Sequence, residues 1–193
     1  MGAYRYITET FESEYSGRNA VYRNRLTSWR KGPTIERIDK PTNLPRARSL
    51  GYKAKRGYAI VRVKVKRGAR RRPAPMGGRK AKNLYFIKPS GLSHQVIAEQ
   101  KAARKYRNME VLNSYWVGDD GDFSYFEVIL ADPSIVKISA TKRRGRAFRG
   151  LTSAGQKGRP SKKVVFNKSI RRKLLLKRLA KMRGRRAEME KRS

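Results

Sequence analysis

Arginine and lysine side chains are concentrated between residues 46 and 72, a stretch that contains no acidic residue. A planar guanidinium can bridge two phosphate oxygens and stack on an exposed base, which suits folded RNA better than a point charge does. Because acids are absent from this neighbourhood, we expect no local ion pairs, and an external polyanion explains the run better than solvated charges do. The predicted RNA contacts in this region are Arg46, Arg48, Lys53, Lys55, Arg56, Arg67, Arg70, Arg71 and Arg72.

A second basic segment, residues 141–160, combines cations with four glycines and several hydroxyl side chains. Glycine lets a backbone approach a phosphate closely, and Ser and Thr hydroxyls can donate to it. The spacing is not that of a P-loop, since Gly155 is followed by Gln156 and Lys157. A flexible tail in the absence of RNA is the alternative. Further RNA contacts are predicted within this segment, after it, and in a long loop that precedes it. They are Arg79, Lys80, Lys82, Arg143, Arg144, Arg146, Arg149, Lys162, Lys163, Arg171 and Arg172.

Residue types for catalysis or metal binding are scarce. The chain has no cysteine and a single histidine, His94, which leaves no material for a thiol nucleophile or a Cys- or His-rich metal site. Asp119, Asp120 and Asp122 lack EF-hand spacing and are predicted to form a hairpin turn. Interleaved with the cations, Tyr52 and Tyr58 can stack on bases or belong to the core. We predict no catalytic residue, no metal, no cofactor and no small-molecule substrate.

The chain as a whole is strongly basic, with 50 Lys and Arg against 14 Asp and Glu in 193 residues, a formal net charge of +36. Repulsion at that charge opposes compaction, so we expect a nucleic-acid partner and binding that weakens with salt. No apolar run exceeds four residues, which argues against a transmembrane span or a signal peptide. A basic amphipathic helix expected at 169–191 could lie on a membrane, but the rest of the chain favours RNA, no membrane partner and a cytoplasmic location.

These side chains must be positioned by a small number of helices and strands. Apolar residues at helical spacing predict two short helices before residue 32, and Ser93 is expected to cap a helix that runs to about residue 107. Strands are expected at 34–39, 58–66, 111–117 and 123–131. In the second, Arg62, Lys64 and Lys66 are expected to face outward. The predicted core residues are Val61, Val63, Val65, Tyr115, Trp116, Phe126, Val128 and Leu130.

The expected domain organisation has three parts. Residues 1–32 form a helical segment, and 33–132 form a core domain that carries a basic loop at 67–91. Residues 133–193 form a basic extension that ends in the terminal helix. Both irregular stretches exceed the usual loop length of roughly 4 to 6 residues. We therefore expect them to thread along RNA, where phosphate contacts offset the entropy of ordering.

Several strings of the sequence resemble the archaeal and eukaryotic large-subunit ribosomal proteins numbered fifteen in the e-series. They are MGAYRYI, LGYKAKRGYAIVRVKVKRGARRRP, VLNSYWVGDDGDFSYFEVILADP and RGLTSAG. The resemblance implies an α+β fold, with a small antiparallel four-stranded sheet, helices and long basic RNA-threading extensions, and no enzymatic activity. The spacing at 79–92 and a Lys/Leu-rich carboxyl end depart from eukaryotic members, which favours an archaeal source. The resemblance assigns RNA contacts to Lys53, Lys55, Arg56, Arg70, Arg71 and Arg72.

We therefore expect a structural constituent of the large ribosomal subunit, with ribosomal RNA and neighbouring ribosomal proteins as partners. Two other classes of protein fit the sequence less well. A histone-like DNA-compacting protein would need the positive charge but not the long irregular loops expected in this chain. An RNA-modifying enzyme would need a positioned acid, base, thiol or metal cluster, and the sequence offers none.

Overall fold

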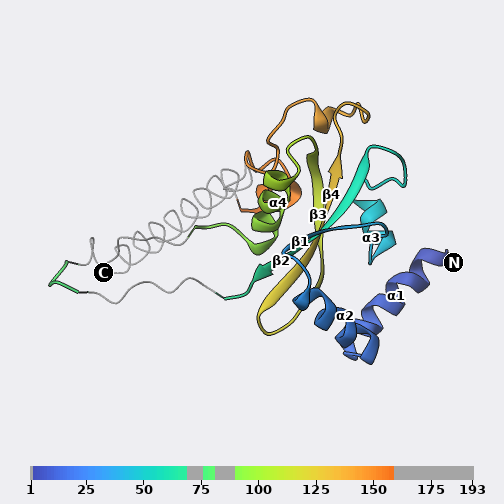
Figure 1. The fold of residues 1–193 in the computed structure, drawn as a ribbon, viewed down its shortest axis with the longest axis horizontal. Coiled ribbons are helices and arrows are strands. Elements are labelled where there is room, and N and C mark those ends of the chain that lie inside the picture. Colours follow the sequence, from blue (N-terminus) through green and yellow to red (C-terminus); the bar gives the residue numbers. More distant parts are fainter. Residues whose placement is uncertain (1, 69–75, 81–89, 159–193) are drawn as a thin grey trace, which may run out of the picture. The chain divides into compact units, whose positions relative to one another are not determined.

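The computed structural model describes residues 2–68, 76–80 and 90–158 (Figure 1). The chain divides into two units, residues 1–158 and 159–193, and every described residue belongs to the first, which is compact. Each helix in the described part is too short or too polar to span a lipid bilayer. The expected helix at 169–191 lies outside the described residues, and the three-part domain division stays a prediction.

A four-stranded antiparallel sheet forms the centre of the first unit. Its strands are β1 (Ile35–Ile38), β2 (Tyr58–Lys66), β3 (Glu110–Asp119) and β4 (Phe123–Ala131), in the order β1-β2-β4-β3. All four predicted strands are thus present, and the α+β class with a small antiparallel four-stranded sheet is confirmed. Two register shifts in β3, next to Leu112 and Val117, change which of its side chains face each side of the sheet.

Both faces of the sheet are buried, each by its own cluster of apolar side chains. On one face α4 (His94–Lys105) lies against the sheet, as both views show, and packs on Val61, Val63 and Val128. The opposite cluster includes Tyr22, Leu26 and Trp29 of α2 (Ala20–Lys31) and Ala47 of α3 (Leu44–Ser49). The predicted core residues are buried except Trp116, which is half-buried.

The expectation that the cations of β2 face outward is wrong for Arg62 and Lys64. Arg62 points toward α2, where its guanidinium lies 4.3 Å from the ring centroid of Trp29 and its side chain is 15% exposed. Lys64 is half-buried and donates to the carbonyl oxygens of Arg30 and Gly32 at 2.9 and 2.7 Å. Only Lys66 is exposed as predicted. The cause is α2, which packs back over this face of the sheet.

The helix α4 begins at the residue that was predicted to cap it. Ser93 accepts from the N–H of Val96 at 3.3 Å, so the predicted cap of α4 is confirmed. Before α2 lies α1 (Ala3–Ser16), which Gly17 follows as its C-cap. The prediction of two helices near the amino terminus is therefore confirmed.

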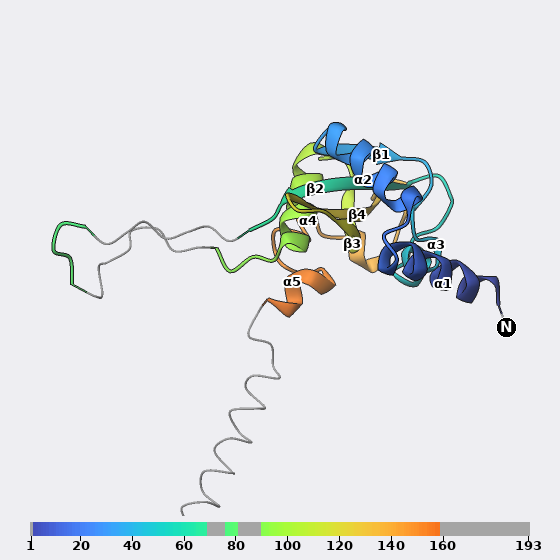
Figure 2. The same ribbon diagram turned by 90° about the horizontal axis from the view of Figure 1, so that it is seen from below.

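A 3-10 turn, η2 (Ser139–Thr141), and α5 (Ser153–Lys157) were not predicted. They place residues 133–158 in the same compact unit as the sheet (Figure 2).

Candidate nucleic-acid interface

The loop between α3 and β2 presents three cations on an ordered backbone. Lys53, Lys55 and Arg56 are exposed, and within the described part of the chain their side chains make no hydrogen bond or ion pair. The loop is anchored before them, where the N–H of Tyr52 donates to the carbonyl of Ala47 at 3.0 Å. These three cations are therefore available to an external anion.

The other end of this loop is anchored at Gly57. Its φ of +91° suits glycine, and a Cβ there would lie 2.8 Å from Cγ2 of Val136. Its carbonyl accepts from the N–H of Asp132 at 2.8 Å. Tyr52 and Tyr58 pack edge to face, 6.5 Å between centroids, against the core, so the core role is favoured over base stacking. The basic loop thus contacts, at Gly57, the stretch that leads into the second basic segment.

Arg46 and Arg48 are exposed on the short helix α3. Asn43 caps this helix by accepting from the N–H of Arg46 at 3.0 Å, and Ala47 is fully buried beneath it. The Arg48 guanidinium lies 5.5 Å from the centroid of Tyr4 and donates to its hydroxyl. Arg48 therefore has a partner within the chain, whereas the side chain of Arg46 faces an open groove.

A buried carboxylate, Glu127 of β4, holds the segment that leads into α3. The side chain is fully buried, and it accepts from the N–H of Thr42 at 3.0 Å, from the Thr42 hydroxyl at 2.5 Å and from the Tyr115 hydroxyl. Burial, together with the adjacent Glu127 charge and its hydrogen bond, raises the pKa of Tyr115 well above its usual value. The start of α3 is thereby fastened to the centre of the sheet.

Two further buried carboxylates hold the second basic segment. Glu110 of β3 accepts from the N–H groups of Gly145 and Arg146 at 3.0 and 2.7 Å. Glu99 of α4 accepts from the hydroxyls of Ser114 and Thr152 at 2.5 and 2.6 Å. Loss of hydration on burial raises the pKa of Glu99, and its two hydroxyl donors offset part of that rise.

The expected role of the glycines and hydroxyls in phosphate binding is contradicted at three residues. A Cβ on Gly155 would lie 2.6 Å from Cα of Gly150, so this glycine serves close packing of the segment on itself. The Gly155 N–H donates to Thr152 at 3.1 Å, and the Thr152 hydroxyl donates to Glu99. The Thr141 hydroxyl is 2.8 Å from the carbonyl oxygen of Val136. These groups are used inside the protein.

The arginines of the second segment differ in exposure. Arg143 and Arg144 are exposed, while Arg146 and Arg149 are half-buried. Arg144 donates to the carbonyl of Arg107 at 3.3 Å, and Arg149 donates to that of Arg143 at 2.9 Å. Both donations orient a guanidinium without neutralising it, because a carbonyl carries no net charge.

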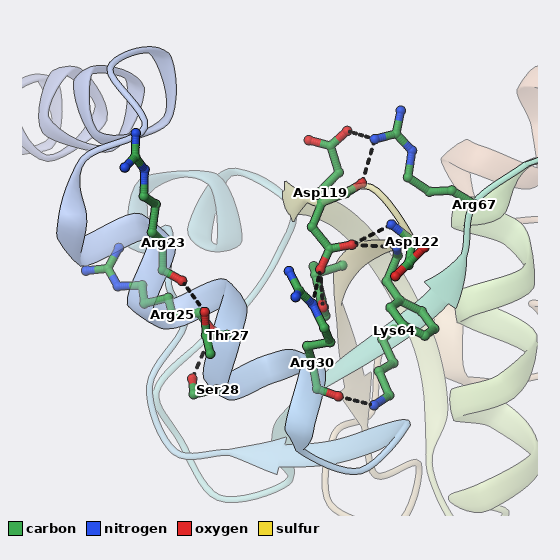
Figure 3. Close-up of polar contacts among 12 residues, drawn as sticks. Arg23, Arg25, Thr27, Ser28, Arg30, Lys64, Arg67, Asp119 and Asp122 are labelled. Carbon is green, nitrogen blue, oxygen red and sulfur yellow. Dashed lines mark hydrogen bonds and ion pairs between the residues drawn. The ribbon is translucent and has the colours of Figure 1, made fainter.

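Ion pairs between distant parts of the sequence contradict the expectation of unopposed charge at Arg62 and Arg67. Arg67 pairs with Oδ2 of Asp119 at 3.0 Å and donates to the carbonyl of Asp120 at 2.7 Å (Figure 3). Arg62 lies 3.4 Å from Glu36 and 3.6 Å from Glu127. The nearest acids in space come from other strands and loops. A cation can therefore be paired although its sequence neighbourhood is purely basic.

The three aspartates at the end of β3 and just after it belong to the predicted hairpin turn. Asp120 accepts from the N–H groups of Asp122 and Phe123 at 2.8 and 2.7 Å, and it pairs with Arg30 at 3.0 Å. Burial on its own would raise the pKa of Asp120, but these donors together with the Tyr125 hydroxyl lower it. No three His, Cys, Asp or Glu side chains in the described ranges are close enough to hold a metal ion.

Only some of the remaining predicted RNA contacts lie within the described residues. Arg79 and Lys80 are exposed in the short described stretch 76–80. The others lie outside the described residues, namely Arg70, Arg71, Arg72, Lys82, Lys162, Lys163, Arg171 and Arg172. Sequence reasoning missed the anchors Glu99, Glu110 and Glu127. For Glu110 and Glu127 the signal was an acid flanked on both sides by apolar residues, clearest in the string FEVILA, whereas Glu99 is followed by Gln100 and Lys101 and gave no such signal.

These features define a class of protein, a small α+β domain that buries several of its few carboxylates, uses them to hold irregular segments, and presents arginine and lysine on ordered loops. The model of the family described as Ribosomal L15, in its e-series form, matches residues 2–175. The chain belongs to this family and is a ribosomal protein of the large subunit, a component of a ribonucleoprotein that acts in translation. The family is one of structural proteins, not of enzymes.

Proposed function

We propose that this protein stabilises folded ribosomal RNA through contacts of its arginine and lysine side chains with phosphates, as a scaffold without catalytic activity. The observation that carries the proposal is the loop with Lys53, Lys55 and Arg56. These cations lack partners among the described residues, and both ends of their loop are anchored to the core. An ordered loop loses little conformational entropy on binding, so each phosphate contact contributes more of its free energy to affinity.

The second ordered segment begins at the same end of the sheet, since Tyr58 and Glu110 both pair with Ala131 and Glu110 holds Gly145 and Arg146. The proposed contacts are all those predicted from the sequence, with Arg143 and Arg144 foremost here because they are exposed. Arg67, although paired with Asp119, keeps an exposed side chain.

Neighbouring ribosomal proteins complete the set of proposed partners. We place the protein in cytoplasmic ribosomes and favour an archaeal source.

The test compares two variants that remove equal charge. In one, Lys53, Lys55 and Arg56 are changed to Ala. In the control, Arg23, Lys31 and Arg37 are changed to Ala, since these are exposed on α2 and β1 away from the proposed surface. Filter binding to large-subunit ribosomal RNA is measured across a salt series. The slope of log K against log salt is expected to fall by roughly 2 to 3 in the first variant, at about 0.7 to 0.9 per phosphate contact, and less in the control. Equal effects of the two variants would contradict the proposal.

A further inference from the structure

An aromatic side chain is exposed in the middle of the second basic segment. Phe148 is 49% exposed, and it is the one aromatic residue between Pro133 and Gly158. Single exposed apolar side chains are common on protein surfaces, so exposure by itself assigns no function to this residue. The backbone beneath the ring, the side chain that lies over it and the charge around it determine what it can bind.

The backbone that carries Phe148 is held in place from several sides. Glu110 accepts from the N–H groups of Gly145 and Arg146 at 3.0 and 2.7 Å, and the N–H of Phe148 donates to the carbonyl of Gly145 at 3.1 Å. The preceding residue, Ala147, is 1% exposed and packs in the apolar cluster between α4 and the sheet. The ring therefore stands on an ordered turn, and a ligand that packs on it would cost little conformational entropy.

A cation lies over the ring of Phe148. The guanidinium carbon of Arg104, close to the end of α4, is 5.8 Å from the ring centroid. Arg104 is exposed, and among the described residues its side chain makes no hydrogen bond or ion pair. Attraction to the ring orients the guanidinium while its N–H groups stay available to an acceptor. We call this pair of side chains the Phe148 platform.

The two stretches of chain that form the platform expose cations and no acid. In α4 and residues 106–109 the only acid is Glu99, which is fully buried, and residues 133–158 contain none. Arg107 and Arg144 are both exposed, and the guanidinium of Arg144 donates to the carbonyl of Arg107 at 3.3 Å. This hydrogen bond joins the two stretches. Positive charge from both of them thus gathers beside an exposed aromatic ring.

The acid that precedes the second stretch, Asp132, does little to neutralise this charge. Its carboxylate accepts from the N–H and the hydroxyl of Ser134 at 3.0 and 2.6 Å. Those two hydrogen bonds are the main cause of the lowered pKa of Asp132, and the charge of Arg144 contributes least to it. Arg144 therefore remains largely uncompensated.

The combination of ring and charge determines which ligand fits. A nucleotide carries a planar ring and a negative charge in one unit, so a base can lie on Phe148 while a neighbouring phosphate reaches Arg104 or Arg144. A basic protein segment would be repelled by these guanidiniums. An acidic protein segment would match the charge but would also have to supply a suitably placed apolar or aromatic side chain. Bases within a double helix are stacked on their neighbours, so the base that reaches the ring must be unpaired.

We propose that the Phe148 platform holds an unpaired base of ribosomal RNA, stacked on the phenyl ring, with Arg104 donating to an adjacent phosphate. This inference rests on the proposed function in taking RNA as the partner, and it adds a contact with a base to contacts with phosphates. It does not depend on the loop at 53–56. Because every base offers a π-face, the site selects an unstacked nucleotide and not a particular sequence.

The first test uses the full chain assembled into large subunits, with a benzophenone-bearing amino acid in place of Phe148. After irradiation, the modified nucleotides are mapped by primer extension on the ribosomal RNA, and protein products are identified by mass spectrometry. A crosslink to one or two unpaired nucleotides is expected. A crosslink to a protein or to a base-paired helix, or the absence of any product, would overturn the proposal.

The second test separates stacking from charge by filter binding of the full chain to large-subunit ribosomal RNA across a salt series. Phe148→Leu keeps an apolar side chain but removes the π-face, so affinity should fall roughly 5- to 10-fold, whereas Phe148→Trp should bind at least as tightly as the parent. The slope of log K against log salt should stay unchanged in both, because no phosphate contact is lost. Equal affinities of Phe148→Leu and the parent would refute the stacked base.

A matched control removes an exposed aromatic ring from a different electrostatic setting. Tyr6 is 60% exposed on α1, a helix with three glutamates and the single cation Arg5. Tyr6→Leu should change affinity by less than about twofold. If it weakens binding as much as Phe148→Leu does, the effect is not specific to the platform and the proposal fails. Urea unfolding should give similar stabilities for both variants and the parent, since both rings are exposed.

The salt series also separates this proposal from the proposed function. If changing Lys53, Lys55 and Arg56 to Ala lowers the salt slope while Phe148→Leu binds like the parent, the phosphate contacts stand and the stacked base is excluded. If Phe148→Leu weakens binding while the Ala variant keeps the slope of the parent, the stacked base stands and the phosphate contacts of the loop fail.

Discussion

Arg62 and Glu127 face each other across the paired strands β2 and β4, and both are shielded from solvent, with side chains 15% and 0% exposed. Their closest atoms, Nη2 and Oε1, are 3.6 Å apart. Glu127 also accepts hydrogen bonds from the N–H and the hydroxyl of Thr42, while Arg62 stacks on Trp29. The pair therefore joins the sheet to α2 and to the start of α3. In a chain with so few acids, this one lies in the core.

Changing Glu127 to Ala should destabilise the fold by about 3 to 5 kcal/mol, because it removes one of the two carboxylate partners of the shielded Arg62 guanidinium and leaves the donors of Thr42 and Tyr115 without their acceptor. Urea unfolding followed by circular dichroism measures the loss. The control is Glu12→Ala, which removes an exposed acid from α1 and should cost under about 1 kcal/mol. Similar values for the two variants would show that the buried contacts of Glu127 contribute little.

Replacing Glu99 with Gln should change how stability depends on pH. The pKa of Glu99 is raised in the folded state, so between its unfolded and folded pKa values the native state binds more protons than the unfolded state. Its contribution is therefore fully present below the ordinary value of 4.5 and is lost as pH rises through the folded pKa. The parent should lose stability relative to Glu99→Gln as pH rises from about 4.5. Parallel curves for the two proteins would refute this.

Adding one methyl group at Gly155 should loosen α5. A Cβ would lie 2.6 Å from Cα of Gly150, where backbone and not a flexible side chain must move. Gly155→Ala is expected to cost about 1 to 3 kcal/mol and to speed amide hydrogen exchange in residues 152–157. Gly158→Ala serves as the control, since its nearest neighbour atom would be 3.9 Å away. Matching exchange in both variants would argue against the packing role.

The anchoring of the first basic loop can be tested without removing any charge. Gly57→Ala introduces strain at a φ of +91° and a contact of 2.8 Å with Val136. We expect affinity for ribosomal RNA to fall roughly 5- to 10-fold while the salt slope changes little, since the cations remain. Gly51→Ala has a similar φ of +99° without a contact within 4 Å and should weaken binding less. If neither variant alters affinity, order in the loop is irrelevant to binding.

The arginine triplet at 70–72 lies outside the described residues and gives a prediction from charge alone. Changing Arg70, Arg71 and Arg72 together to Ala should reduce incorporation into large subunits while leaving the isolated fold largely unaltered. Gradient sedimentation with quantitative mass spectrometry measures incorporation. Equal amounts of variant and parent in the subunit fraction would contradict the expectation.

Local patterns in the sequence were sufficient to predict most of the helices and strands. Alternating valines predicted β2, Ser93 predicted the start of α4, and the aspartates between residues 119 and 122 predicted the hairpin turn. These features arise from backbone geometry and short-range hydrogen bonds, which neighbouring residues determine. The short helix α5 escaped prediction because it has five residues and depends on Glu99, which is remote in the sequence.

The sequence by itself determined the class of the protein, its basic character, the loops that carry exposed cations and the order of its strands along the chain. Only the tertiary structure decided which cations are free to act outside the protein. Arg62 and Lys53 are equivalent in a purely basic stretch of sequence, yet the first is covered by α2 and the second is exposed. The reason is that burial and ion pairing depend on contacts between residues far apart along the chain, which spacing and composition do not specify.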